Sequence, residues 1–314
     1  MGLDGTSTAP ADDPSQPLEH IRYPIGWLGT GFMGGAMAAR LLTGGQQLVV
    51  WNRTREKTAT LAAAGARVAA TPAEVSSRCP LIMLCLTADA VERVVFGPDG
   101  LATAAASTQL VVDHTTMHPD LARRLAARWR AQTGGAWVDA PVTGGVLAAE
   151  AGRLTVFAGG DRADVDQASK HLDAYAKCCH YTGPSGCGQA VKLCNQVIVG
   201  ATIWSLAEAT TLAGAAGIDP ALLPGWLRDC PVDSGLLQMM QPLMAAGVRK
   251  TGWLSMTRVV DDLHAALDLA RTAGAPLPLT ASVAQLLHIA TLWTPPDELC
   301  RFADLLSGPT TTKG

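Results

Sequence analysis

Short apolar runs alternate with segments of helical periodicity from residue 24 to residue 180. Apolar runs of this kind, bounded by turn residues, are typical of buried strands, and strands that alternate with helices predict βαβ units in a mostly parallel sheet. The expected strands are Ile25–Leu28, Gln47–Trp51, Leu81–Leu86, Leu110–Asp113, Trp137–Ala140 and Thr155–Ala158. The expected helices between them include Met33–Thr43, Thr54–Ala64 and Pro119–Thr133. This alternation restricts the first part of the chain to an α/β fold.

After Gly183 the strand pattern stops and a long apolar segment begins. Residues 186–217 carry only Lys192 and Glu208 as charged side chains, and their apolar residues surround the whole helix axis. As a helix this segment would extend about 48 Å, and a helix that is apolar on nearly all sides is expected to be buried on nearly all sides. We therefore expect it between domains or between subunits. Further helices are expected at about 220–230, 235–247, 255–274 and 278–306.

Charge, hydropathy and cysteine content argue against several classes of protein. The formal net charge is −3 and no basic block occurs, which disfavours a nucleic-acid-binding surface. No apolar run reaches the ~18–20 residues of a membrane span, because polar side chains interrupt the long apolar segment. The eight cysteines are scattered, without a CxxC pair or a Cys/His cluster of ligand spacing. We therefore expect reduced thiols, no bound metal and a cytoplasmic location.

Three glycines, Gly29, Gly31 and Gly34, form a GxGxxG motif between an expected strand and an expected helix. The first permits a tight turn, the second lets the backbone approach a phosphate, and the third packs the helix against the strand. The helix N-terminus then presents N–H groups to a pyrophosphate. A purely structural glycine turn is the alternative. We predict a Rossmann-type doubly wound parallel sheet with a dinucleotide-binding loop of Gly29, Thr30, Gly31, Phe32, Met33 and Gly34.

The end of the second expected strand indicates which dinucleotide binds. An NAD-selective site usually has an acidic residue here for the ribose 2′-hydroxyl, whereas this chain has Asn52, Arg53 and Thr54. A guanidinium and a hydroxyl can pair with a 2′-phosphate that a carboxylate would repel. We therefore predict NADP(H) in preference to NAD(H). The alternative is that the arginines merely keep a turn solvated.

These patterns divide the chain into four parts. Residues 1–22 are polar, acidic and proline-bearing, without the apolar stretch of a signal peptide, and are expected to form a disordered leader. The NADP-binding domain is expected over residues 23–184, and an all-helical domain for substrate binding and dimerisation over residues 185–308. Residues 309–314 form a tail.

Two segments carry residues that suit catalysis. Thr143, Gly144 and Gly145 form a turn after an expected strand, where backbone N–H groups and a hydroxyl can face a carboxylate. Lys192 lies about one turn inside the long apolar helix, with Asn195 three residues further on the same face. Burial and the positive helix end both lower the pKa of such a lysine, which suits proton transfer to a carbonyl oxygen. A lysine that extends its ammonium into solvent is the alternative.

The motifs GTGFMGGAMAARL, WNRT, DHTTMHP, DAPVTGG and GCGQAVKLCN occur in this order within residues 25–306. With these motifs the chain resembles the β-hydroxyacid dehydrogenases, the family of 3-hydroxyisobutyrate dehydrogenase, tartronate semialdehyde reductase and NADPH-dependent glyoxylate reductases. The resemblance implies that Lys192 is the catalytic acid/base and Asn195 its companion. It also implies that the turn at Thr143, Gly144 and Gly145 holds the substrate carboxylate.

The resemblance carries two further expectations. Thr116 matches the second hydroxyl residue of the family's Ser-Thr pair and would lie near the nicotinamide. Family members pair their subunits through the helical domain, which implies a homodimer or a dimer of dimers and suits the apolar segment 186–217. A small-molecule substrate, without nucleic acid or membrane, completes the expected partners.

One residue departs from the family pattern. Family members usually carry a Lys-Asp pair whose lysine reaches toward cofactor and substrate, whereas this chain has Asp261 followed by Asp262. Asp261 therefore reverses the charge at a cofactor-facing position and puts the usual small acidic substrate in question. Two alternatives stay open: reduction of a different electrophile such as a cyclic imine, and a non-catalytic NADP(H)-binding protein on the same fold.

Overall fold

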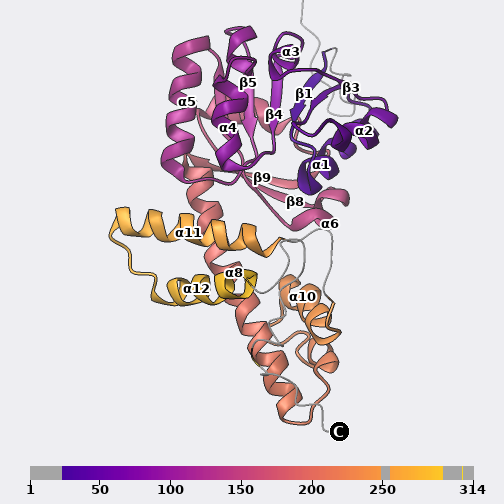
Figure 1. Cartoon of the computed structure of the whole chain (residues 1–314), viewed down its shortest axis with the longest axis vertical. Coiled ribbons are helices and arrows are strands. Elements are labelled where there is room, and N and C mark those ends of the chain that lie inside the picture. Colours follow the sequence, from indigo (N-terminus) through magenta and orange to yellow (C-terminus); the bar gives the residue numbers. More distant parts are fainter. Residues whose placement is uncertain (1–22, 249–254, 293–305, 307–314) are drawn as a thin grey trace, which may run out of the picture.

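The computed structural model describes residues 23–248, 255–292 and 306 of the chain. The expected leader, the tail and the end of the last expected helix lie outside these residues. Figure 1 shows an α/β domain from which one long helix leads into a helical region.

A mixed nine-stranded sheet forms the centre of the α/β domain, in the order β3-β2-β1-β4-β5-β6-β8-β7, with β9 beside β8. The strands β1 to β6 are parallel to one another, whereas β8 runs antiparallel to β6 and β7 and parallel to β9. The strands are β1 (Ile25–Leu28), β2 (Leu48–Trp51), β3 (Arg67–Val68), β4 (Leu81–Leu84), β5 (Leu110–Asp113), β6 (Ala136–Asp139), β7 (Val142–Thr143), β8 (Leu154–Gly159) and β9 (Ala176–Gly183). The predicted mostly parallel sheet is confirmed.

The strand order reverses at β1, which has β2 on one side and β4 on the other. Leu28, the last residue of β1, is in register with Trp51 of β2 and Leu84 of β4. The chain therefore leaves all three strands at the same edge of the sheet. In open α/β sheets this reversal at the carboxyl ends of the strands creates a crevice where ligands bind.

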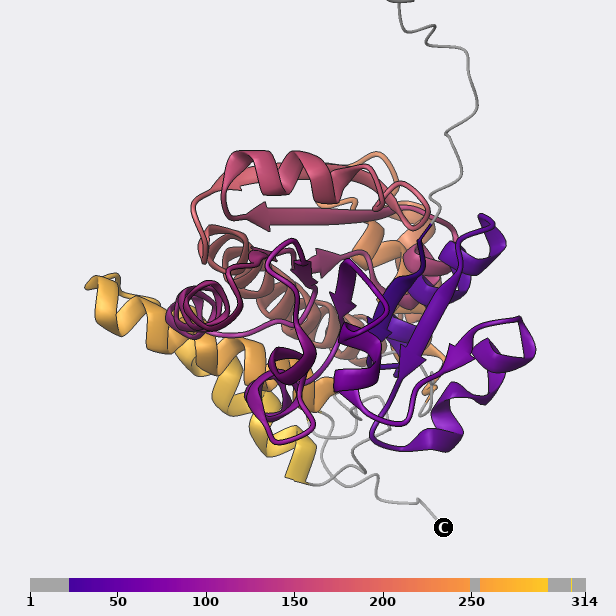
Figure 2. The same cartoon turned by 90° about the horizontal axis from the view of Figure 1, so that it is seen from above.

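Helices cover both faces of the sheet, as the view from above shows (Figure 2). Adjacent residues of β1 point to opposite faces, because Trp27 packs in one apolar cluster and Leu28 in the other. Strands buried on both faces are typical of parallel sheets. The helices of this domain are α1 (Phe32–Thr43), α2 (Ala59–Ala63), α3 (Pro72–Ser76), α4 (Ala88–Phe96), α5 (Pro119–Thr133), α6 (Gly145–Glu150) and α7 (Arg162–Ser169), with 3₁₀ turns η1 (Arg55–Thr58) and η2 (Leu101–Ala104).

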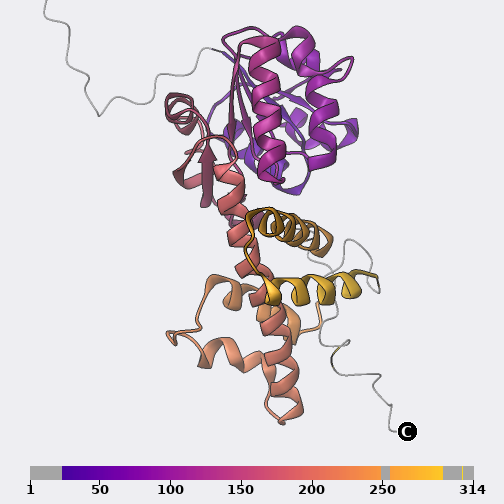
Figure 3. The same ribbon diagram turned by 90° about the vertical axis from the view of Figure 1, so that its left-hand side faces the viewer.

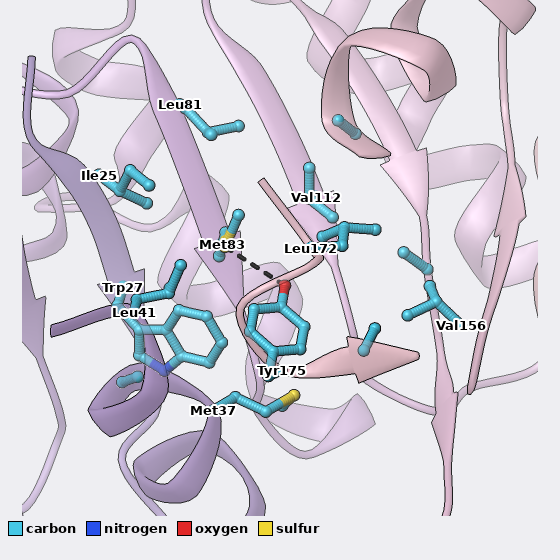
Figure 4. Packing of buried hydrophobic residues seen from close by; sticks show 14 of the residues in the cluster. Ile25, Trp27, Met37, Leu41, Leu81, Met83, Val112, Val156, Leu172 and Tyr175 are labelled. Atoms are coloured by element: carbon cyan, nitrogen blue, oxygen red, sulfur yellow. Dashed lines mark hydrogen bonds between the residues drawn. The ribbon is translucent and has the colours of Figure 1, made fainter. Parts of the chain in front are cut away.

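The buried Tyr175, just before β9, joins the two halves of the sheet. Its ring lies beside Trp27 and Met37 from the first βα unit (Figure 4), with 6.1 Å between the ring centroids of Tyr175 and Trp27. Its hydroxyl donates a hydrogen bond to Met83 Sδ at 3.5 Å and lies 2.8 Å from His114 Nε2. These contacts link the segment just before β9 to the central strands β1 and β4.

One continuous helix, α8 (Cys187–Ala215), connects the α/β domain to the helical region (Figure 3). Buried residues in its middle part pack against the apolar side chains of three of the later helices, in a separate core. The packing is close, because a Cβ on Gly200 would lie 2.9 Å from the Leu263 side chain. The remaining elements are η3 (Pro220–Leu222), α9 (Leu223–Trp226), α10 (Gly235–Ala245), α11 (Met256–Ala273) and α12 (Pro278–Leu292).

The expectation that α8 is buried on nearly all sides is wrong for the single chain. By length and hydropathy α8 could cross a membrane, yet only 39% of its most apolar stretch is buried. Ile198 and Leu212 are 69% and 71% exposed. The helices α10, α11 and α12 pack against α8 but leave part of its circumference uncovered.

Candidate active site

The fold itself requires glycine at two positions of the loop after β1. Gly29 has φ +97°, and a Cβ there would lie 2.1 Å from the carbonyl oxygen of Cys85. A Cβ on Gly34 would lie 2.1 Å from the carbonyl oxygen of Gly29. These two glycines therefore allow the turn and the close packing of α1 against the end of β4.

Gly31 is different, because no neighbouring atom of the protein requires a glycine there. Its φ is −69°, which any residue adopts, and a Cβ would meet no atom within 4 Å. The residue is exposed and caps α1 without a side-chain hydrogen bond to the first turn. The first turn of α1, from Phe32 and Met33 onward, thus begins beside open space that a side chain at residue 31 would occupy. This arrangement fits the pyrophosphate of a dinucleotide.

The residues after β2 brace this loop and border it. Asn52 accepts a hydrogen bond from the backbone N–H of Thr30 at 3.1 Å and donates one to the carbonyl oxygen of Thr54 at 2.9 Å. Arg53 and Thr54 are exposed at the same edge of the sheet. The pKa of Asp89, at the start of α4, is lowered mainly by a hydrogen bond from Thr87 and to a smaller extent by the charge of Arg53. Asn52 is therefore engaged by the backbone, and Arg53 and Thr54 are left to contact a ligand.

The first turn of α8 is fastened to the ends of β5 and β6. The buried carboxylate of Asp139 accepts hydrogen bonds from the N–H groups of Gly186 at 2.7 Å and Gln189 at 3.1 Å. The side chain of Gln189 accepts from the N–H of Met117 at 2.9 Å and donates to the carbonyl oxygen of Thr115 at 2.7 Å. These hydrogen bonds hold the start of α8 against the sheet. They therefore determine where the next residues of α8 lie relative to the α/β domain.

Lys192 lies on this fastened part of α8 with its side chain inside the protein. The residue is 8% exposed, so its ammonium is not extended into solvent. Its Nζ donates a hydrogen bond to Gln196 Oε1 at 3.1 Å. Burial lowers the pKa of Lys192, and the nearby charge of Asp262 partly opposes this effect.

Gln196 connects the site residues to one another. Its Oε1 also accepts a hydrogen bond from Asn195 Nδ2 at 3.0 Å, and its Nε2 donates to Asp262 Oδ2 at 2.6 Å. Thr143 Oγ1 lies 3.5 Å from Asn195 Oδ1 and donates to it. The structure thus brings Thr143, Lys192 and Asn195 together, and it joins them through Gln196 to α11.

The sequence did not single out Gln196 or assign a role to Asp262. Among the described residues, Asn195 and Lys192 are connected through the Gln196 amide, because both donate a hydrogen bond to its Oε1. The i,i+4 spacing of Lys192 and Gln196 was the available signal, because residues four apart share a helix face as well as residues three apart. Burial raises the pKa of Asp262 to about 6, although the charge of Lys192 lowers it.

The other predicted residues border this network. Gly144 and Gly145 follow Thr143 with φ +128° and +76°, values that favour glycine. Thr116 is partly buried between Thr115 and Met117, which both bond Gln189 one turn before Lys192. Asp261 is exposed on α11 next to Asp262. Within residues 23–248 and 255–292, no group of three His, Cys, Asp or Glu side chains could hold a metal ion.

Comparisons with known proteins identify the family of the chain. Residues 24–183 match the NAD-binding domain of 6-phosphogluconate dehydrogenase, and residues 186–296 match the domain described as NAD-binding of NADP-dependent 3-hydroxyisobutyrate dehydrogenase. The chain is 31% identical over 283 residues to a probable mitochondrial 3-hydroxyisobutyrate dehydrogenase of Dictyostelium discoideum, covering 86% of this chain and 88% of the relative. It is 30% identical over 295 residues to chloroplastic glyoxylate/succinic semialdehyde reductase 2 of Arabidopsis thaliana, covering 93% and 81%.

A solved structure extends the likeness to three dimensions. The 3-hydroxyisobutyrate dehydrogenase of Salmonella typhimurium superposes with a TM-score of 0.81 at 26% identity, covering 90% of this chain and 98% of that protein. Sequence and fold therefore agree over both the α/β domain and the helical region. The chain is an NAD(P)-dependent oxidoreductase that belongs to the 3-hydroxyisobutyrate dehydrogenase family of β-hydroxyacid dehydrogenases.

Proposed function

We propose that the protein interconverts a small β-hydroxy acid and its aldehyde or keto acid with NADP(H), and that Lys192 is the general acid/base. The observation that carries this proposal is the buried Lys192 side chain, whose pKa is lowered by burial, in a hydrogen-bonded network with Gln196 and Asp262. A lowered pKa makes the lysine a better proton donor, and its neutral amine can accept the proton in the reverse direction.

The residues of the site divide the chemistry between them. The loop Gly29–Gly34 would hold the dinucleotide, which when bound would supply or accept the hydride at the substrate carbon. Lys192 Nζ donates a proton to the carbonyl oxygen in reduction and removes the hydroxyl proton in oxidation. Gln196 holds this amine in place through Oε1. The hydroxyl of Thr143 and the N–H groups of Gly144 and Gly145 bind the substrate carboxylate.

The preference for NADP(H) rests on the edge of the sheet beside β2. Arg53 and Thr54 are exposed there, and Asn52 occupies the position where a carboxylate would bind a ribose 2′-hydroxyl. The Asn52 side chain is hydrogen-bonded to the backbone of Thr30 and Thr54. We therefore assign it to stabilising the loop and not to binding the ribose. A guanidinium and a hydroxyl suit a 2′-phosphate.

We also propose that the protein forms a homodimer, or a dimer of dimers, through the helical domain. The exposed face of α8 presents Ile198 and Leu212, and α12 presents Leu279 and Leu292 at 64% and 69% exposure. Large apolar side chains that are exposed in the single chain are candidates for burial by a second copy. A second copy would complete the burial expected of α8.

A substrate panel tests the proposed reaction. Glyoxylate, succinic semialdehyde, tartronate semialdehyde, methylmalonate semialdehyde and a cyclic imine are each assayed with NADPH and with NADH. We expect turnover of one or more of the acids, with NADPH preferred. Turnover of the imine alone would contradict the acid assignment and support reduction of a different electrophile. Tight NADPH binding without any turnover would support a non-catalytic role.

A further inference from the structure

Helix α11 turns one face toward the active site. Asp262 Oδ2 accepts the hydrogen bond from Gln196 Nε2 at 2.6 Å, so the Asp262 face of α11 points toward Lys192. Arg258 lies four residues, about one helical turn, before Asp262 and shares this face. Its side chain is exposed. The first turn of α11 thus places a guanidinium beside the Lys192 network, nearer the helix N-terminus.

Arg258 also acts electrostatically on Cys85, at the crevice where the strand order reverses. Its positive charge lowers the pKa of Asp262 and also that of Cys85, although burial raises both overall. Cys85 follows β4 and touches the loop after β1, because a Cβ on Gly29 would meet the Cys85 carbonyl oxygen. Figure 1 shows α11 crossing directly below the α/β domain beside α8. The guanidinium therefore lies near enough to both Asp262 and Cys85 for its charge to act on them.

Among the described residues, no hydrogen bond or ion pair occupies Arg258. Arg271, on the same helix, is held by Asp268 at 2.8 Å, and Arg162 is held by Asp166 at 2.9 Å. Arg258 has neither kind of partner, although Asp261 lies one turn away. Its donors are thus available to a ligand that enters the crevice.

The charges around the site show what this arginine changes. Lys192 contributes a positive charge when protonated, and Asp261 and Asp262 contribute two negative charges. These three groups alone sum to −1 and would repel a carboxylate, whereas Arg258 brings the sum to zero. The departure at Asp261 is therefore offset within the same helix turn.

We propose that Arg258 binds the carboxylate of the substrate and makes the enzyme selective for acidic substrates, in the place of the lysine that Asp261 replaces. This inference rests on the proposed β-hydroxy acid reaction. A planar guanidinium can contact a carboxylate through two parallel hydrogen bonds. The turn at Thr143, Gly144 and Gly145 offers hydrogen bonds to the same group without a full charge, so the two contacts are complementary.

The test compares an acid with its neutral analogue. Wild type and Arg258→Gln are assayed with NADPH on methylmalonate semialdehyde and on its methyl ester, methyl 2-methyl-3-oxopropanoate. We expect the KM for the acid to rise about 10- to 100-fold in Arg258→Gln, the weight of a lost charge-assisted hydrogen bond. The KM for the ester should stay within about twofold. The affinity for NADPH, measured by fluorescence titration, should not change.

Three control variants separate charge from structure. Arg258→Lys retains the charge and should keep most of the selectivity for the acid. Asp261→Lys in the Arg258→Gln background should recover part of it. Arg271→Gln, a matched arginine on the same helix, should change neither KM. Weaker NADPH binding in Arg258→Gln, with an unchanged ratio of acid to ester, would assign Arg258 to a cofactor phosphate and overturn the proposal.

A binding measurement distinguishes a failure of the Arg258 proposal from a failure of the proposed reaction. Calorimetric titration of 3-hydroxyisobutyrate into the NADPH complex needs no turnover, because the hydroxy acid and the reduced cofactor cannot react with each other. A wild type that is inactive on every acid refutes the proposed reaction, whereas weaker binding of 3-hydroxyisobutyrate to Arg258→Gln than to wild type still supports Arg258. Equal binding to the two proteins, including no binding to either, overturns the role of Arg258.

Discussion

At the scale of single residues, the site depends on a lysine under two opposed influences. Burial favours the neutral amine of Lys192, and the carboxylate of Asp262 favours the ammonium. Gln196 lies between them and contacts both. The protonation state of the lysine is therefore set jointly by α8 and α11.

Replacing Asp262 with Asn should shift the pH dependence of turnover. The negative charge of Asp262 raises the pKa of Lys192 against the effect of burial, so its removal should lower that pKa further. Reduction needs the ammonium and should decline at lower pH than in wild type. Oxidation needs the neutral amine, and its rise should also move to lower pH. Profiles of kcat against pH in both directions provide the measurement.

Asp262 has its own signature in the same profiles. Its pKa is raised to about 6 by burial, so the wild type should show a break near that pH as the carboxyl becomes protonated. The break should be absent in Asp262→Asn. Profiles that coincide for the two proteins would show that Asp262 does not act on Lys192.

Replacing Arg53 with Ala should reduce the preference for NADPH. Loss of a charge-assisted contact to the 2′-phosphate should weaken NADPH binding about tenfold, while NADH binding should change little. Dissociation constants for both cofactors provide the measurement, and Arg55→Ala serves as a neighbouring control. An unchanged NADPH/NADH ratio in Arg53→Ala would rule out the assignment.

The residues of the site were only partly predictable. Lys192 follows from its place in an apolar helix, but the sequence paired it with Asn195, and the structure shows Gln196 in contact. Residues three and four apart are both neighbours on a helix. The rotation of α8 relative to α11 decides between them, and that rotation depends on packing across some seventy residues of chain. For the same reason, the sequence alone does not assign Arg258 to the site.

At the scale of elements, the fastening of α8 to the sheet positions the catalytic lysine. Asp139 is the last residue of β6, and its buried carboxylate receives the first N–H groups of α8. Because Lys192 lies only five residues after Cys187, the first residue of α8, its position depends on where the helix starts. The sheet, more than the helical region, therefore determines where Lys192 lies relative to the cofactor loop.

Replacing Asp139 with Ala should destabilise the protein. The N–H groups of Gly186 and Gln189 would lose their buried acceptor, at a cost of about 1–3 kcal/mol each. We expect the free energy of unfolding in urea to fall by about 2–5 kcal/mol. Asp139→Asn keeps one acceptor and should cost less. Asp166→Ala, which removes an exposed ion pair, is the control, and an equal loss in both alanine variants would contradict the fastening role.

The elements themselves were predicted well where their burial is uniform. The bounds of β1, β5 and α5 agree with the expected strands and helix, because each is a fully buried apolar run or a strongly amphipathic segment. β9 was not predicted, because Lys177, His180 and Tyr181 are exposed and interrupt any apolar run. The two-residue strands β3 and β7 carry too few residues to show a period, and only their pairing to neighbours defines them.

At the scale of the whole molecule, α8 links the two domains and carries both the catalytic lysine and an uncovered apolar face. Lys192 lies near its N-terminal end, and Leu212 lies near its C-terminal end. The expectation of full burial was drawn from composition, which does not distinguish burial within one chain from burial between two. Association of two copies reconciles that expectation with the exposed face.

Replacing Ile198 with Asp should convert the protein to a monomer. A buried charge without a partner is costly in an apolar interface, whereas the side chain is 69% exposed in the single chain and its replacement should leave the fold intact. Light scattering after size exclusion gives the mass. Val232→Asp, at a residue that is 60% exposed outside α8, is the control. A wild type that is already monomeric would refute the proposed dimer.

The role of Lys192 is the central claim, and the turnover of Lys192→Met tests it most directly. Methionine keeps the volume and apolar contacts of the lysine stem without an amine. With NADPH and the preferred acid of the wild type, we expect kcat to fall about 10²- to 10⁴-fold, the contribution of a general acid, with NADPH affinity unchanged. A kcat within a few-fold of the wild type would contradict the account.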